Sequence, residues 1–95
     1  MEIDTRGITQ RSVIPIGTTT LLNRNGYSIP VPATLAAIPG SGGTLLVEYQ
    51  LAADGAWTAW PAGAAATKTV YVLTGPVYAL RFTAAVADGV VEMAQ

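Results

Sequence analysis

The chain contains neither cysteine nor histidine among its 95 residues. Without cysteine it forms no disulfides and has no thiolate ligands for a metal. Without histidine it lacks the side chain that enzymes use most often as a general base, which argues against acid–base and nucleophilic catalysis. The missing cysteine and histidine therefore say more about the function of the chain than any motif that it contains.

Charged residues are also scarce, at 12% of the chain against about 25% in an average soluble domain. The formal net charge of −1 provides no electrostatic basis for nucleic-acid binding. Hydrophobic residues make up 51% and the mean hydropathy is +0.41, so an isolated monomer would expose large apolar patches. We therefore expect the protein to act against copies of itself or against a partner.

Long apolar runs are missing as well, because Pro or Gly interrupts every stretch that approaches the roughly 18 residues of a membrane span. The first residues do not place a basic segment before an apolar one, so no signal peptide is predicted. Four charged residues fall within the first eleven positions, namely Glu2, Asp4, Arg6 and Arg11. Residues 1–10 are predicted to form a polar N-terminal arm, either frayed or laid along a neighbour, and residues 11–95 a single β-domain.

Alternation of apolar and polar residues is the strongest pattern that the chain does contain. Residues 44–51, 77–84 and 90–95 place apolar side chains at every second position, which is typical of half-buried antiparallel strands. In the last of these segments, Val91 and Met93 are the expected inward pair.

The first half is less regular. Residues 12–16, 18–22 and 27–31 are predicted to be extended, because they are rich in β-branched residues or proline. Residues 34–38 fit either a short strand or one helical turn.

Turn dipeptides separate these segments. Asp54-Gly55 and Asp88-Gly89 are predicted to close type I′ hairpins, in which both central residues have positive φ. Asn25-Gly26 marks another turn, and the glycine-rich residues 39–43 a flexible loop. With turn signals every 8 to 12 residues or so, about six to nine short strands predict an all-β fold, either a small antiparallel β-sandwich or a barrel.

The two tryptophans are the most conspicuous candidates for recognition. Trp57 and Trp60 are three residues apart, so on a strand they would face opposite sides, and at most one would pack inside. An exposed tryptophan either stacks on a sugar ring or anchors a protein interface, and core packing is the structural alternative. Arg81, between two apolar neighbours, is expected to pair with Glu48 or Glu92 across the sheet.

No arrangement of residues predicts catalysis or a cofactor. Asp54 and Asp88 are interpreted as turn formers. Residues 39–44 have the glycine density of a phosphate-binding loop but lack its lysine, and a strand is expected to follow instead of a helix. Neither a catalytic site nor a metal or cofactor site is predicted, and the protein is not expected to be an enzyme.

A resemblance to a known class of proteins appears in the second half of the chain. An aliphatic strand, a tryptophan hairpin, an arginine-containing strand and a glycine turn into a last strand follow one another in residues 43–49, 57–63, 76–84 and 89–95. This succession resembles small virion proteins of tailed bacteriophages, which include head decoration (cement) proteins and tail or fibre β-domains.

The resemblance implies a non-enzymatic role in the virion. A decoration protein would be made in the host cytoplasm and bind the major capsid protein on the capsid exterior, often as a homotrimer or other homo-oligomer. Neither nucleic acid nor a membrane is an expected partner. The alternative is a tail or fibre domain that binds carbohydrate or another tail protein. The interface candidates are Trp57, Trp60, Arg6, Arg11 and Arg81.

Overall fold

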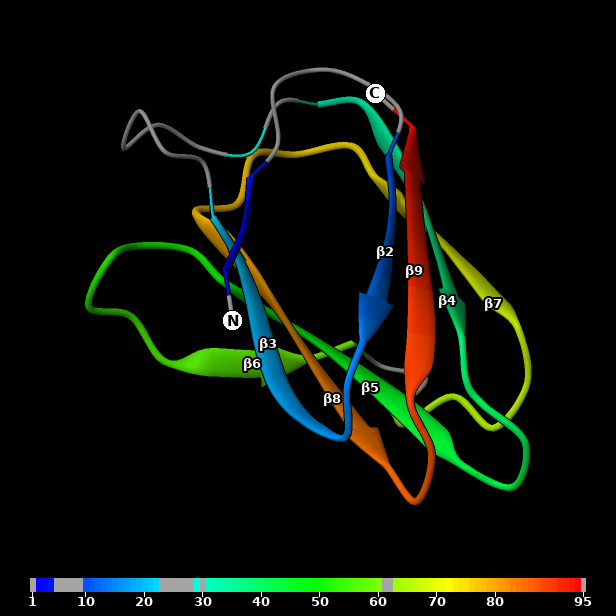
Figure 1. Ribbon diagram of the computed structural model, residues 1–95. Helices are drawn as coiled ribbons and strands as arrows, with labels where there is room; N and C mark the ends of the chain where they lie inside the picture. The colour runs from blue at the N-terminus through cyan, green and yellow to red at the C-terminus, as the bar shows by residue number, and fades with distance from the viewer. Residues whose placement is uncertain (1, 5–9, 23–28, 30, 61–62, 95) are drawn as a thin grey trace.

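The computed structural model describes residues 2–4, 10–22, 29, 31–60 and 63–94, and this part of the chain forms nine β-strands and no helix (Figure 1). The strands are β1 (Glu2–Asp4), β2 (Gln10–Ile14), β3 (Gly17–Leu22), β4 (Ala33–Ile38), β5 (Thr44–Gln50), β6 (Trp57–Ala59), β7 (Thr69–Leu73), β8 (Ala79–Ala85) and β9 (Gly89–Ala94). The segment that fitted either a strand or a helical turn is therefore a strand, β4.

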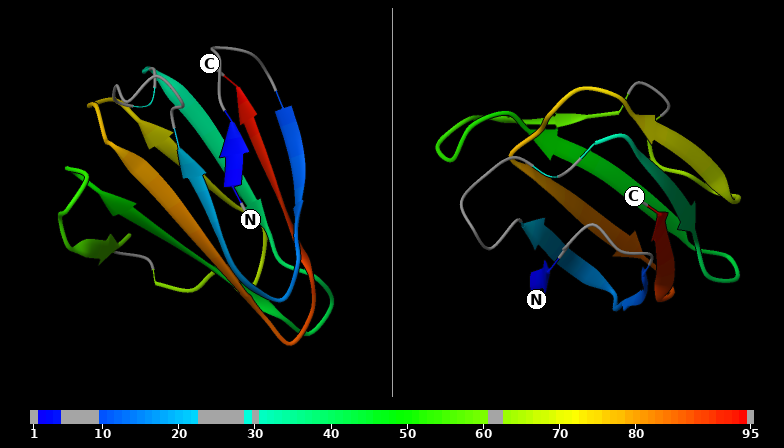
Figure 2. Two further views of the ribbon diagram at one scale, coloured as in Figure 1. Left: turned by 60° about the vertical axis from the view of Figure 1, so that its left-hand side comes forward. Right: turned by 90° about the horizontal axis from the view of Figure 1, so that it is seen from above.

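Two sheets lie face to face (Figure 2). Sheet A has the strand order β1-β3-β8-β5-β6, and sheet B has the order β2-β9-β4-β7. All neighbouring strands are antiparallel except β1, which runs parallel to β3. The predicted all-β fold is confirmed, and the arrangement is that of a small β-sandwich.

The core lies between the sheets and follows the predicted alternation. Leu80 and Phe82 of β8 in sheet A are fully buried. Val91 and Met93 of β9 in sheet B belong to the same core cluster. Strands such as β4 and β9 therefore contribute every second side chain to the interior, as a period of two requires. Burial of these side chains on folding is the main stabilising contribution.

One end of the sandwich is closed by three chain connections. The links β2–β3, β4–β5 and β8–β9 each cross from one sheet to the other, and all three lie at the lower end in Figure 1. The β8–β9 link lies in the middle, where the Asp88 carboxylate accepts a hydrogen bond from the Ile16 amide at 2.9 Å. On its other side, a Cβ added at Gly40 would collide with the Asp88 carbonyl oxygen. The glycine-rich loop is therefore packed against a neighbouring connection, where a larger residue does not fit.

The predicted type I′ turns at the two Asp-Gly dipeptides are wrong, although β5 and β6 on either side of Asp54-Gly55 do form an antiparallel hairpin. None of these four residues has positive φ, and β8 and β9 belong to different sheets, so Asp88-Gly89 does not close a hairpin. Asp54-Gly55 lies in the longer loop of residues 51–56, which is held by a Gly55–Ala52 backbone hydrogen bond and by the Gln50 amide donating to the Ala53 and Gly55 carbonyls. A type I′ turn requires a two-residue loop between paired strands, and neither site meets that condition.

The first ten residues are described in part. Glu2–Asp4 of the expected N-terminal arm form β1 alongside Thr20–Leu22 of the same chain. Gln10 begins β2. The predicted turn at Asn25-Gly26 and most of the predicted strand at residues 27–31 lie outside the described residues.

Because the β4–β5 and β8–β9 links are in close contact, adding one methyl group at Gly40 is expected to destabilise the fold. We expect Gly40→Ala to lower the free energy of unfolding by about 1–3 kcal/mol, because its Cβ overlaps backbone atoms that cannot move independently. Gly75→Ala is the control, since its added Cβ meets no atom within 4 Å, and its effect should stay within about 1 kcal/mol. Urea unfolding measures both, and equal losses would contradict the packing described.

Val86, in the β8–β9 link, has a φ of 74° although it is β-branched, and its side chain is 76% exposed. The left-handed region costs an ordinary residue roughly 1–2 kcal/mol, whereas Asn tolerates it. We expect Val86→Asn to raise the free energy of unfolding by about 1 kcal/mol. Val13→Asn is the control, at an exposed valine within β2. It should not raise the free energy of unfolding, because the backbone at Val13 is already extended. A melting temperature that rises in both variants would refute the strain argument.

Candidate interaction surface

The outer faces of the two sheets differ in chemistry. On sheet A, the outward side chains include Thr18, Thr83, Glu48 and Arg81, and they bond to one another. Arg81 Nε donates to Glu48 Oε1 at 2.9 Å, and the Thr18 and Thr83 hydroxyl oxygens are 3.4 Å apart. Among the described side chains, this face is largely polar, and its charged residues Arg81 and Glu48 are paired with each other.

The outer face of sheet B is mostly apolar. The strand register places Val13, Val90 and Ile38 in one row across the sheet, and Val70 and Val72 in the next two rows on β7. Val13, Val70 and Val72 are 56–59% exposed. We call these five residues the valine face. Large side chains of this kind, placed side by side on a sheet and left to solvent, are typical of an interaction surface.

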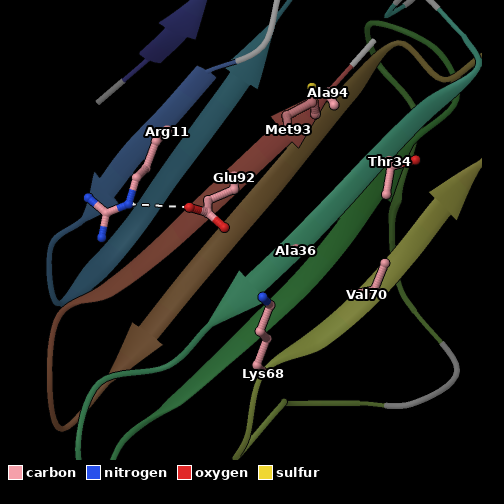
Figure 3. A pocket seen from close by; sticks show the side chains of 8 residues that line it. All are labelled: Arg11, Thr34, Ala36, Lys68, Val70, Glu92, Met93 and Ala94. Atoms are coloured by element: carbon pink, nitrogen blue, oxygen red, sulfur yellow. Dashed lines mark ion pairs between the residues drawn. The ribbon is translucent and has the colours of Figure 1, made fainter.

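A groove of about 570 Å³ crosses this face (Figure 3). Small residues form its floor: Ala36 and Thr34 of β4 and Ala94 of β9. Arg11 and Glu92 form one margin and are joined by an exposed ion pair of 3.4 Å, while Lys68 and Val70 form the other. The ion pairs of the described residues do not include Lys68. An apolar centre with charges at its margins is the usual anatomy of a protein–protein interface.

The two tryptophans face opposite sides, as predicted. Trp60 packs against the core between the sheets, with ring centroids 5.5 Å from Tyr49 and 5.0 Å from Tyr71. Trp57 lies on the outer face of sheet A, where the Arg81 guanidinium lies 4.5 Å from its ring centroid. Arg81 therefore covers one face of the half-buried Trp57 ring, which leaves less of that ring to stack on a sugar.

The aromatic cluster around Trp60 contains a residue that the sequence did not single out. Tyr71 is buried, and no described residue hydrogen-bonds its hydroxyl. Loss of solvation raises the pKa of the Tyr71 hydroxyl above its ordinary value. The ring fills space between the sheets, and its phenol stays neutral at physiological pH.

The candidate residues do not converge on one site. Arg11 lies beside the valine face, Trp57 and Arg81 lie on the opposite face, and Trp60 lies between the sheets. Arg6 lies outside the described residues. The expected partner of Arg81 is confirmed as Glu48.

What the sequence reasoning missed is the valine face. Its signal was the placement of outward valines and Ile38 on one face of β2, β9, β4 and β7, which depends on the strand order. The local pattern of any one strand does not contain that order.

Groups that could support chemistry are kept apart. Glu48 and Glu92 lie on the outer faces of different sheets, so they form no carboxylate pair. Within the described part of the chain, no three Asp or Glu side chains come together in a metal-binding arrangement. Nor does that part contain a helix long and apolar enough to cross a membrane.

No family model, curated protein or solved structure matches this chain significantly. The surfaces themselves therefore carry the functional argument.

The two ion pairs provide a test of how differently the two faces are built. Glu48 and Arg81 side chains are 15% and 30% exposed, whereas Glu92 and Arg11 are 43% and 62% exposed. We expect Glu48→Gln to lower the free energy of unfolding by about 1–2 kcal/mol, because it weakens a charge-assisted bond to the half-buried Arg81. Glu92→Gln should change it by less than about 0.5 kcal/mol, as for other exposed pairs. Urea unfolding at neutral pH measures both, and the reverse order would contradict the contrast.

Proposed function

We propose that the protein is a non-enzymatic structural component of a bacteriophage particle, a decoration protein that binds the major capsid protein on the capsid exterior through the valine face. The observation that carries the proposal is the contrast between the two sheets. One outer face is polar and internally paired, while the other exposes Val13, Val70 and Val72 beside a groove. The resemblance of residues 43–95 to tailed-phage virion proteins supports the same role.

The size of the valine face sets the strength of one contact. Burying a few hundred Å² of apolar surface at about 25 cal/mol/Å² contributes roughly 5–10 kcal/mol before costs. Association in solution costs about 4–15 kcal/mol in lost freedom and ordering. A single contact is therefore weak. Copies that also bind one another would attach to a repeating shell through several contacts at once, which raises their overall affinity. A homo-oligomer on a capsid fits this requirement.

The charges at the groove define what the partner surface must offer. Arg11 is partly compensated by Glu92, whereas Lys68 has no carboxylate partner among the described residues. The complementary surface is apolar at its centre and carries an acidic residue opposite Lys68. Such a charge at the margin chiefly increases the association rate, and salt reduces its effect.

The test uses capsids that lack this protein, assembled from the major capsid protein of the same phage. We expect wild-type protein to co-sediment with these shells and to raise their disruption temperature. The double variant Val70→Lys/Val72→Lys should abolish both effects, because it places two charges among the exposed apolar side chains of the contact. Circular dichroism should show this variant folded, because both side chains point to solvent.

Leu51→Lys is the matched control: Leu51 is 68% exposed, but it lies in the β5–β6 loop, away from the valine face. It should bind like wild type. Wild-type protein that neither binds the shells nor raises their disruption temperature would refute the proposal. Glycan binding that is lost in Trp57→Ala would then support the alternative, a carbohydrate-binding tail or fibre domain.

A further inference from the structure

The four edge strands of the sandwich are not equally protected. β1 and β6 have three residues each, and β2 carries Arg11 and is followed by Pro15. Short length, charge and proline are the features by which natural proteins prevent edge strands from pairing with other chains. β7 has none of them: its five residues, Thr69-Val70-Tyr71-Val72-Leu73, include neither a charge nor a proline.

No described strand occupies the outer edge of β7. β7 lies along one margin of the molecule and pairs with β4 on its inner side (Figure 1). Within the described residues, no strand pairs with its other side. Val70 and Val72, on its outward face, are 56% and 59% exposed. A β-branched, uncharged edge of this length is a template for strand addition.

We propose that the free edge of β7 pairs antiparallel with β7 of a second copy, joining the two four-stranded B sheets into one continuous sheet. The register that pairs all five residues has its twofold axis at Tyr71. Val70 then lies opposite Val72 of the second copy, and Thr69 opposite its Leu73. Each outward pair consists of two β-branched side chains, which is a favourable cross-strand combination.

Charge selects the antiparallel arrangement. Lys68 immediately precedes β7. In a parallel pair the two Lys68 side chains would be neighbours about 4.8 Å apart across the ladder, and like charges placed so destabilise the pairing. In the antiparallel pair they lie at opposite ends of a ladder that is about 17 Å long.

The area predicts a weak dimer. A five-residue ladder with two valines on each copy buries less than the roughly 1,200 Å² of a stable standard interface. Dimerisation in free solution therefore requires high protein concentration. The pairing does not depend on the proposed function, because it uses the backbone edge of β7, whereas a capsid would contact the outward side chains of the sheet.

The chain has no cysteine, so introduced cysteines report the pairing directly. Equal amounts of Val70→Cys and Val72→Cys protein are mixed at high concentration and oxidised. In the Tyr71-centred register these positions face each other with Cα atoms about 4.5–5.5 Å apart, within the range of a disulfide. We expect a covalent heterodimer as the main product of the mixture and little dimer in either variant alone.

A mixture of Leu51→Cys and Val86→Cys is the control, since both positions are exposed and lie outside β7. Sedimentation of the unmodified protein should show a twofold rise in mass with concentration. Cross-linking no greater than in the control, with monomer at every concentration, would overturn the proposal. A disulfide-linked dimer of Val72→Cys alone would also overturn it, because that dimer requires another register. So would a disulfide between Val70→Cys and a cysteine of a capsid protein that forms while the Val70→Cys and Val72→Cys proteins fail to cross-link. Capsid binding by the wild-type protein is measured separately from cross-linking, so either proposal can fail without the other.

Discussion

The rest of the structure depends on how the β8–β9 link packs between the two other connections at the closed end of the sandwich. Its Asp88 carboxylate accepts the amide hydrogen of Ile16 from the β2–β3 link, and its backbone lies against Gly40 of the β4–β5 link. Because each link joins both sheets, these contacts set the spacing and alignment of the two layers together. The burial of Leu80, Phe82 and Met93 follows from that alignment.

The unusual composition becomes intelligible once the two outer faces are compared. A sandwich needs apolar side chains on the inner face of each sheet, and polar residues normally cover both outer faces. Here sheet A follows that rule with threonines and the Arg81–Glu48 pair, while sheet B breaks it at Val13, Val70 and Val72. Within the described strands, the apolar residues that remain outside the core are therefore most exposed on the outer face of sheet B. That asymmetry is the strongest reason to regard the molecule as part of an assembly.

The sequence predicted the fold class well because a period of two is a local property of each strand. It identified the inward residues of β8 and β9 and the pairing of Arg81 with Glu48.

The hairpin at Asp88-Gly89 was wrong because a dipeptide does not reveal whether its flanking strands belong to one sheet, whereas at Asp54-Gly55 the strands do pair and only the turn type was wrong. β8 and β9 look like a hairpin in sequence, yet they pair with other strands. The valine face was missed for the same reason, since it depends on strand order.

The order of the strands also has a kinetic consequence. β8 and β9 are the last two strands along the described chain, yet β8 lies in the middle of sheet A, and β9 lies between β2 and β4 in sheet B. The bond from Ile16 to Asp88 spans 72 positions. Neither sheet can therefore assemble while the ribosome is still synthesising residues 79–94. Folding must wait for nearly the whole segment and then close long loops, which makes it slow for a domain of this size.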